Sequence, residues 1–201
     1  PLGTLDAEFR ELMCSELRKL HNEINATTVY VTHDQQEAMS MGDRIAVMNE
    51  GKILQYGSPK EIYSKPKTLF VGSFIGSPSM NFIPINHGLQ KGSSKVKIGD
   101  TDFKVPKLLQ NSEVSNNVLG IRPEKMFLSD ENGINGSVFG SEYLGTRKII
   151  TVESDFGNYK IRVSNDINLK IGTNIKFNFD SKSVIIYDGK TEEALKSELI
   201  E

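Results

Sequence analysis

Several features that would point to a special class of protein are missing from this sequence of 201 residues. Its single cysteine, Cys14, cannot form a disulfide within the chain, so we expect a reducing compartment such as the cytosol. The net charge of −2 gives no electrostatic reason to expect nucleic acid as a partner. No apolar run approaches the roughly 20 residues that a membrane-spanning helix needs. What remains is an ordinary globular composition, with 37% hydrophobic and 25% charged residues.

The first 75 residues carry the patterns of an α/β domain. Apolar residues spaced three and four apart predict a helix over residues 6–24. The β-branched and aromatic run 27–32 predicts a strand that is covered on both faces, as in a parallel sheet. Two runs over residues 45–55, with Gly51 between them, predict a hairpin. Helix starts are predicted at Ser58-Pro59 and at about Lys67.

The segment between the predicted strand and the hairpin has the signals of a short capped helix. Asp34, followed three residues later by Glu37, predicts a capping box for a helix over residues 35–41. Gly42 is expected to close that helix in the left-handed conformation. We interpret Asp34 and Glu37 as capping groups rather than catalytic ones, and Asp43-Arg44 as a local ion pair.

The second half of the sequence has a different texture. Gly, Ser and Pro over residues 76–84 predict a linker, and residues 85–190 show short runs of period-two alternation separated by turns. This pattern predicts a small antiparallel barrel, and the tail, residues 191–201, is expected to be helical. Six aromatic side chains of this half are expected in its core: Phe103, Phe127, Phe139, Tyr143, Phe177 and Phe179.

His33 is the strongest candidate for a functional residue. It follows directly on the predicted strand and precedes a helix start, and ligands of open α/β sheets bind beyond the carboxyl ends of the strands. The alternative is a surface histidine in a loop, or a histidine that is a satisfied partner in a cap network. His21 and His87 are expected at the surface, and no metal site is expected. A nucleophilic role for Cys14 is disfavoured because no base accompanies it.

The neighbours of His33 resemble a known family. The resemblance rests on two segments, PLGTLD and VYVTHDQQEAMSMGDRIAVMNEGKILQYGSP, and further along on FVGSFIGSPSMNF and LGIRPE. Together these resemble the ATPase subunits of ATP-binding-cassette (ABC) importers, in the branch for carbohydrates such as maltose, glycerol 3-phosphate or multiple sugars. The resemblance implies the C-terminal part of a P-loop ABC ATPase domain, followed by an OB-like regulatory barrel of the TOBE type. Residues 1–75 would form the ATPase part and residues 85–190 the barrel.

The resemblance also implies roles and partners. His33 would be the switch histidine that contacts the γ-phosphate of ATP, and Leu5 and Asp6 would belong to the D-loop at the dimer interface. The cofactors would be ATP and Mg²⁺ in the full-length subunit. The partners would be a second ATPase subunit, transmembrane permease subunits and a cytoplasmic regulator, without nucleic acid. The expected location is the cytoplasmic face of the cell membrane, held there by the permease.

The parts of the family pattern that bind nucleotide are not in these 201 residues. The sequence contains no Gly-x-x-x-x-Gly-Lys-Ser/Thr phosphate loop, no Leu-Ser-Gly-Gly-Gln signature and no Walker B carboxylates. We therefore expect the 201 residues alone not to bind ATP tightly or to hydrolyse it. Two other hypotheses remain: a subunit for import of polyamines, metal ions or other solutes, and a stand-alone regulatory barrel that binds a small ligand.

Overall fold

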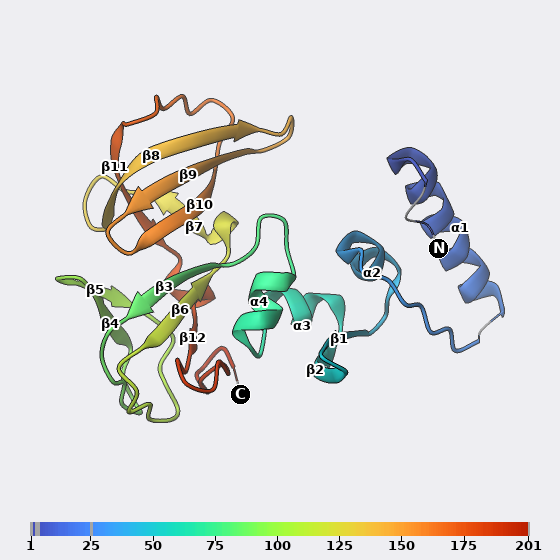
Figure 1. Cartoon of the computed structure of the whole chain (residues 1–201), viewed down its shortest axis with the longest axis horizontal. Coiled ribbons are helices and arrows are strands. Elements are labelled where there is room, and N and C mark those ends of the chain that lie inside the picture. Colours follow the sequence, from blue (N-terminus) through green and yellow to red (C-terminus); the bar gives the residue numbers. More distant parts are fainter. Residues whose placement is uncertain (1, 3–4, 25, 201) are drawn as a thin grey trace. The chain divides into compact units, whose positions relative to one another are not determined.

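The computed structural model describes residues 2, 5–24 and 26–200 (Figure 1). The chain divides into two compact units, residues 1–63 and 64–201. The first unit combines helices with a hairpin, and the second is built almost wholly from strands, which confirms the expected α/β part followed by an all-β part. Within the described residues, no helix is both long and apolar enough to span a membrane.

The first unit follows the short-range sequence signals closely. Its elements are α1 (Ala7–Ile24), α2 (Gln35–Met41), β1 (Ile45–Asn49), β2 (Lys52–Gly57) and α3 (Pro59–Ser64). The strands β1 and β2 pair antiparallel, and Glu50 and Gly51 at the turn have φ values of 48° and 76°. A two-residue turn with positive φ at both positions matches the twist of a hairpin. At the start of α3, Ser58 and Glu61 exchange hydrogen bonds in a capping box.

Two expectations for the first unit are wrong. Residues 27–32 form no strand, and the side chains of Val29 and Val31 are 86% and 82% exposed. An apolar strand needs neighbours that satisfy its backbone and cover its faces, and no described strand pairs with this segment. Gly42 is extended, with φ −79° and ψ 132°, instead of left-handed. It still suits the site, because a Cβ there would lie 2.9 Å from the carbonyl oxygen of Ala38.

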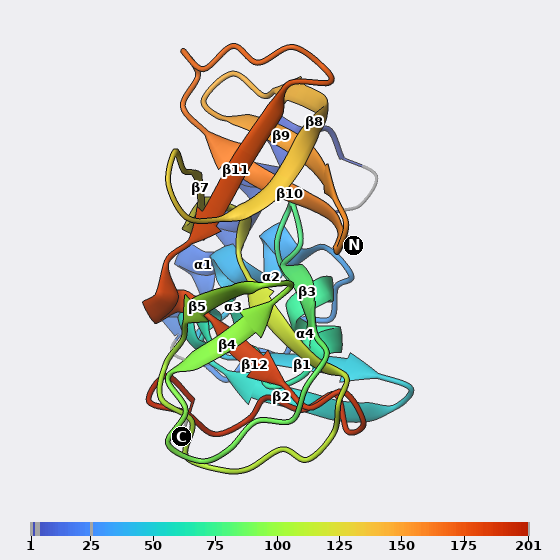
Figure 2. The same cartoon turned by 90° about the vertical axis from the view of Figure 1, so that its left-hand side faces the viewer.

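The second unit contains the predicted antiparallel strands (Figure 2). It opens with α4 (Leu69–Phe74), whose N-cap is Thr68. Three sheets follow, with all pairs antiparallel. A curled five-stranded sheet has the order β10 (Gly157–Val163), β9 (Lys148–Ser154), β8 (Ile134–Tyr143), β11 (Asn174–Phe179), β7 (Met126–Leu128). A three-stranded sheet has the order β12 (Ile185–Tyr187), β6 (Asn117–Ile121), β3 (Asn81–Ile85), and β4 (Lys95–Ile98) pairs with β5 (Thr101–Lys104). Two short 3₁₀ turns are also present, η1 (Pro123–Lys125) and η2 (Ser181–Ser183).

One hydrophobic core joins the sheets of this unit. Tyr159 of β10 and Phe177 of β11 lie in it with their ring centres 5.6 Å apart, and Leu119 of β6 is fully buried. Buried Arg122 ties α4 to this barrel, because its Nη1 donates to the carbonyl oxygens of Gly72, at 3.1 Å, and Ile75. These contacts satisfy carbonyls that the end of the short helix leaves unpaired.

The structure differs from the sequence predictions at three places in the second unit. The expected linker over residues 76–84 overlaps β3, which starts at Asn81 and pairs with β6. The tail is not helical; it makes isolated bridges, such as Tyr187 with Ala194, and buries alternate side chains against the barrel. Of the six aromatic residues expected in the core, Phe127, Phe139 and Tyr143 are exposed.

Candidate functional site

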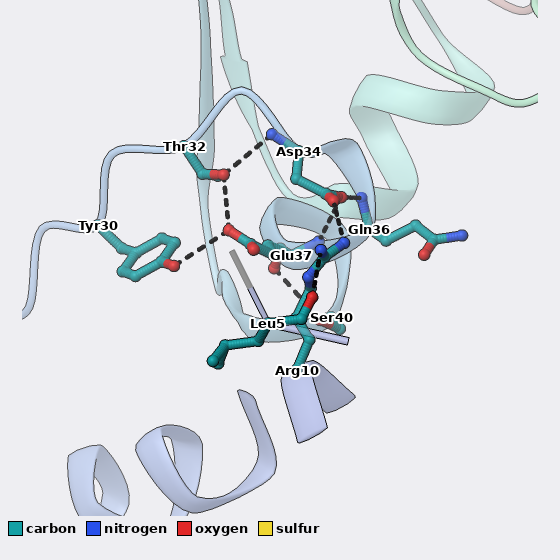
Figure 3. Close-up of polar contacts among 8 residues, drawn as sticks. All are labelled: Leu5, Arg10, Tyr30, Thr32, Asp34, Gln36, Glu37 and Ser40. Carbon is teal, nitrogen blue, oxygen red and sulfur yellow. Dashed lines mark hydrogen bonds and ion pairs between the residues drawn. The ribbon is translucent and has the colours of Figure 1, made fainter. Parts of the chain in front are cut away.

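His33 lies on the short loop between the extended segment 26–32 and α2. Its side chain is exposed, and no hydrogen bond or ion pair joins it to any residue that the structure describes. The imidazole is therefore available to a group that comes from outside the described chain. The residues on either side of it are held firmly by polar contacts (Figure 3).

Asp34 holds the backbone immediately after His33. Its Oδ1 accepts hydrogen bonds from the N–H groups of Gln36 and Glu37, at 2.7 and 3.2 Å. Asp34 is thus the N-cap of α2, as predicted. Its other oxygen, Oδ2, lies 3.3 Å from Nη1 of Arg10 in α1. The two carboxylate oxygens therefore serve two different elements, the helix that follows His33 and the helix near the start of the chain (Figure 3).

Glu37 holds the segment before His33. Its carboxylate is buried, with 3% of the residue exposed, and Oε2 accepts from the hydroxyls of Tyr30 at 3.0 Å and Thr32 at 2.6 Å. Desolvation, followed by the hydrogen bond to Glu37, raises the pKa of Tyr30 to about 12. The predicted capping box is confirmed only in its first half, the cap by Asp34. Its second half would need the carboxylate of Glu37 to accept from the N–H of Asp34, and that N–H donates to Oγ1 of Thr32 instead, at 2.9 Å. Glu37 is an anchor for residues 30–32.

Leu5 and Asp6 lie at the start of α1. The carboxylate of Asp6 accepts from the N–H of Phe9 at 2.8 Å, so Asp6 caps the helix. The carbonyl oxygen of Leu5 accepts from Nη2 of Arg10 at 2.9 Å. Gly3 and Thr4, which the resemblance would also assign to the D-loop, lie outside the described residues. Arg10 thus brings Leu5 and Asp34 together, although they are far apart in the sequence (Figure 3).

A second arginine of α1 holds the other end of α2. Arg18 donates from Nη1 to the carbonyl oxygen of Met41 at 2.7 Å, and from Nη2 to Oδ1 of Asp43 at 2.5 Å. The bond from Arg18 lowers the pKa of Asp43. The predicted ion pair between Asp43 and Arg44 is therefore wrong, and Arg44 lies 3.7 Å from Glu61 instead. Each of the two adjacent residues therefore has its partner in another element, Asp43 in α1 and Arg44 in α3.

The remaining candidates have no catalytic geometry. Cys14 is buried in α1, and burial raises the pKa of its thiol, which makes it a poor nucleophile. His21 and His87, which were expected at the surface, are half-buried. Among the described residues, no group of three or more His, Cys, Asp or Glu side chains is arranged to hold a metal ion.

Sequence reasoning missed Arg10, Tyr30 and Thr32. A signal was present for Arg10, which follows Asp6 by four residues and so lies on the same face of α1. Its contact with Asp34 spans 24 positions and has no sequence signal. Chemically, the arrangement presents one exposed histidine from a loop that is anchored on both sides. Such a residue can donate one hydrogen bond to an anionic ligand, but the ligand must be held mainly by other groups.

The chain is similar to known proteins over nearly its whole length. Residues 119–186 match the model of the TOBE domain family. The trehalose/maltose import ATP-binding protein MalK of Thermococcus litoralis is 37% identical over 97% of this chain and 55% of that protein. The oligosaccharides import ATP-binding protein MsmX of Bacillus subtilis is 36% identical over 98% of this chain and 56% of that protein. The sn-glycerol-3-phosphate import ATP-binding protein UgpC 2 of Agrobacterium fabrum is 34% identical over 98% of this chain and 53% of that protein.

One solved structure has a weaker similarity to this chain. The molybdate-bound structure of the cytoplasmic molybdate-binding protein ModG aligns with 53% of this chain and 94% of that chain, at 14% identity and a TM-score of 0.40. A similarity of that size supports no inference here. The chain spans about half the length of the curated relatives that it matches. Over nearly its whole length the chain is similar to ATP-binding proteins of ABC transporters, and residues 119–186 match the TOBE domain family.

Proposed function

We propose that this chain is the C-terminal part of an ATPase subunit that powers the import of sugars or glycerol phosphates. The observation that carries the proposal is the similarity over nearly the whole chain to three subunits named for such import. Residues 1–75 would belong to the ATPase domain and the barrel, residues 85–190, to a regulatory domain. Permease subunits and a second ATPase subunit would be the partners.

His33 is the residue of this chain that would contact the γ-phosphate of ATP. Phosphoryl transfer depends on positioning and charge stabilisation more than on covalent chemistry by the protein. The geometry supports such a role, because the imidazole is exposed while Asp34 and Thr32 on either side of it are anchored. An anchored loop loses little conformational entropy when its side chain binds, so the hydrogen bond to phosphate is used for positioning.

Leu5 and Asp6 would lie at the interface with the second ATPase subunit. The rest of the nucleotide site, including the phosphate loop and the residues that hold Mg²⁺, would be supplied by segments that these 201 residues do not contain. MgATP would supply the phosphoryl group, and this chain would supply His33 and the backbone that presents it. We accordingly expect no ATP hydrolysis by the 201 residues alone.

The test is to replace His33 in the full-length subunit assembled with its permease. His33→Ala should lower kcat for ATP hydrolysis by about 100-fold, because it removes a hydrogen bond that strengthens in the transition state. The KM for ATP should change little, since the phosphate loop holds the nucleotide. His87→Ala in the barrel is the matched control and should leave kcat unchanged. Equal kcat for His33→Ala and the wild type would contradict the role of His33, and failure of sugars or glycerol phosphates to stimulate hydrolysis would contradict the proposed substrate class.

A further inference from the structure

Arg10 has a position that no other described residue shares. Its guanidinium donates from Nη2 to the carbonyl oxygen of Leu5, at 2.9 Å, and from Nη1 to Oδ2 of Asp34, at 3.3 Å. It thereby connects the start of α1 with the residue that follows His33 (Figure 3). The proposed function places the first of these segments at the interface with the second ATPase subunit and the other at the nucleotide.

We propose that Arg10 is a positioning residue that couples the Leu5–Asp6 segment to the loop that presents His33. The inference rests on the proposed function, since it assigns Arg10 a part in that same site. In this role Arg10 would act through Leu5 and Asp34 rather than through the nucleotide. When a second subunit contacts Leu5 and Asp6, any shift of the Leu5 carbonyl is passed through Arg10 to Asp34, and so to its neighbour His33.

The planar shape of the guanidinium makes this coupling specific. Its two terminal nitrogens point in fixed directions, so the group holds a carbonyl and a carboxylate at a set distance from each other. A lysine has one nitrogen on a flexible stem and cannot impose that geometry. The side chains of Arg10 and Asp34 are 30% and 27% exposed, so the attraction is partly screened by water. Geometry rather than raw attraction is therefore the main contribution of this pair.

Asp34 is suited to transmit a shift of Arg10 because both of its carboxylate oxygens and its backbone N–H are engaged in hydrogen bonds. Oδ1 takes the two N–H groups of α2, Oδ2 takes Arg10, and the backbone N–H donates to Thr32. Thr32 is in turn bound to buried Glu37. A displacement of Oδ2 therefore cannot be absorbed by a free rotation of the side chain without breaking the helix cap.

Arg18 provides a matched comparison on the same helix. It also connects α1 with the region of α2, but at the far end, through Met41 and Asp43. If arginine contacts between the helices acted only by stabilising the first unit, Arg10→Lys and Arg18→Lys would have similar effects. If Arg10 positions the loop of His33, only Arg10→Lys changes hydrolysis.

The first experiment measures ATP hydrolysis by the full-length subunit with its permease. Arg10→Lys should lower kcat by about ten-fold, while the KM for ATP changes by less than about two-fold. Asp34→Asn should act similarly, because asparagine still caps α2 but no longer carries the charge that binds Arg10. The kcat of the double variant should be no lower than that of the less active single variant, because both substitutions remove the same coupling. Multiplicative losses, or an equal loss in Arg18→Lys, would overturn the proposal.

The second experiment needs no nucleotide and separates this inference from the proposed function. In the 201-residue chain, Asp34→Asn should shift the backbone amide resonances of Asp6 and Phe9 by nuclear magnetic resonance. In an Arg10→Lys background the same substitution should leave them unshifted. A shift that persists without Arg10, or none in either background, would overturn the coupling. If the full-length wild type did not hydrolyse ATP, the proposed function would fail, and this second experiment would still decide whether Arg10 connects the two segments.

Discussion

Replacing Glu37 by glutamine tests whether this buried carboxylate anchors the segment before His33. Glutamine keeps nearly the same shape and can still accept hydrogen bonds through one oxygen, but it has no charge. Two hydroxyls, of Tyr30 and Thr32, donate to Oε2 of Glu37 at 3.0 and 2.6 Å. The substitution therefore changes two charge-assisted hydrogen bonds into neutral ones.

The magnitude follows from the net strengths of the two kinds of bond. A hydrogen bond to a charged group contributes about 1.5–3 kcal/mol and a neutral one about 0.5–1.5 kcal/mol, so each bond loses about 1 kcal/mol. The two together lose about 2 kcal/mol, which corresponds to an increase of about 30-fold in local opening. Amide hydrogen exchange in α2 measures this opening residue by residue.

The titration of Tyr30 provides an independent measurement. Its pKa is raised to about 12 by desolvation and then by Glu37, so Glu37→Gln should move it part of the way toward the ordinary value of about 10. Ultraviolet absorbance, with Tyr30→Phe as the reference, isolates this residue. Exposed Glu16 of α1 offers the control, and Glu16→Gln should change neither measurement. Unchanged exchange and an unchanged Tyr30 titration in Glu37→Gln would refute the anchoring role.

Three further predictions concern packing and ionisation. Burial raises the pKa of Tyr159 to about 12. The contribution of the neutral Tyr159 to the free energy of unfolding is therefore complete below the unfolded pKa of about 10 and is lost as the pH rises toward 12. In urea unfolding, Tyr159→Phe should reduce this loss of stability at alkaline pH. Gly120→Ala should lower the stability of the barrel by about 1–3 kcal/mol, seen as a lower Tm, because the new Cβ would lie 2.6 Å from a ring carbon of Tyr187 and 2.7 Å from the sulfur of Met80. Iodoacetamide should alkylate Cys14 more than about ten-fold faster in urea than in the folded chain, because burial both covers the thiol and raises its pKa. Equal rates would mean that the thiol is not covered in the folded chain.

The sequence determined the elements whose signals lie within a few residues of one another. The helix α1, the cap of α2 by Asp34 and the capping box of Ser58 with Glu61 all depend on spacings of three or four, which a helix turns into contacts. Alternation likewise predicted most strands of the barrel, since successive side chains of a strand point to opposite faces. The motif around His33 identified the family, because it too is a local pattern.

Tertiary structure decided which segments found partners. Residues 27–32 have the composition of a buried strand, yet they are exposed because no described strand pairs with them. The strand β8 has a weak alternation, since Gly136 and Gly140 interrupt its pattern. Gly136 is required by packing, because a Cβ there would lie 2.6 Å from Cγ1 of Val152. Phe139 lies where the register of β8 shifts, so alternation alone could not place it inside or outside.

The same division applies to the candidate site. His33, Leu5 and Asp6 were identified from short segments that resemble a family. Arg10 could be assigned to the site only from the fold, because its contact with Asp34 joins residues 24 positions apart. Local spacing selects a helix or a turn through contacts within one element, whereas the partner of a long side chain depends on which other element the fold brings within its reach. The sequence thus predicted which residue would face a ligand, and only the tertiary structure decided which groups hold the backbone on either side of it.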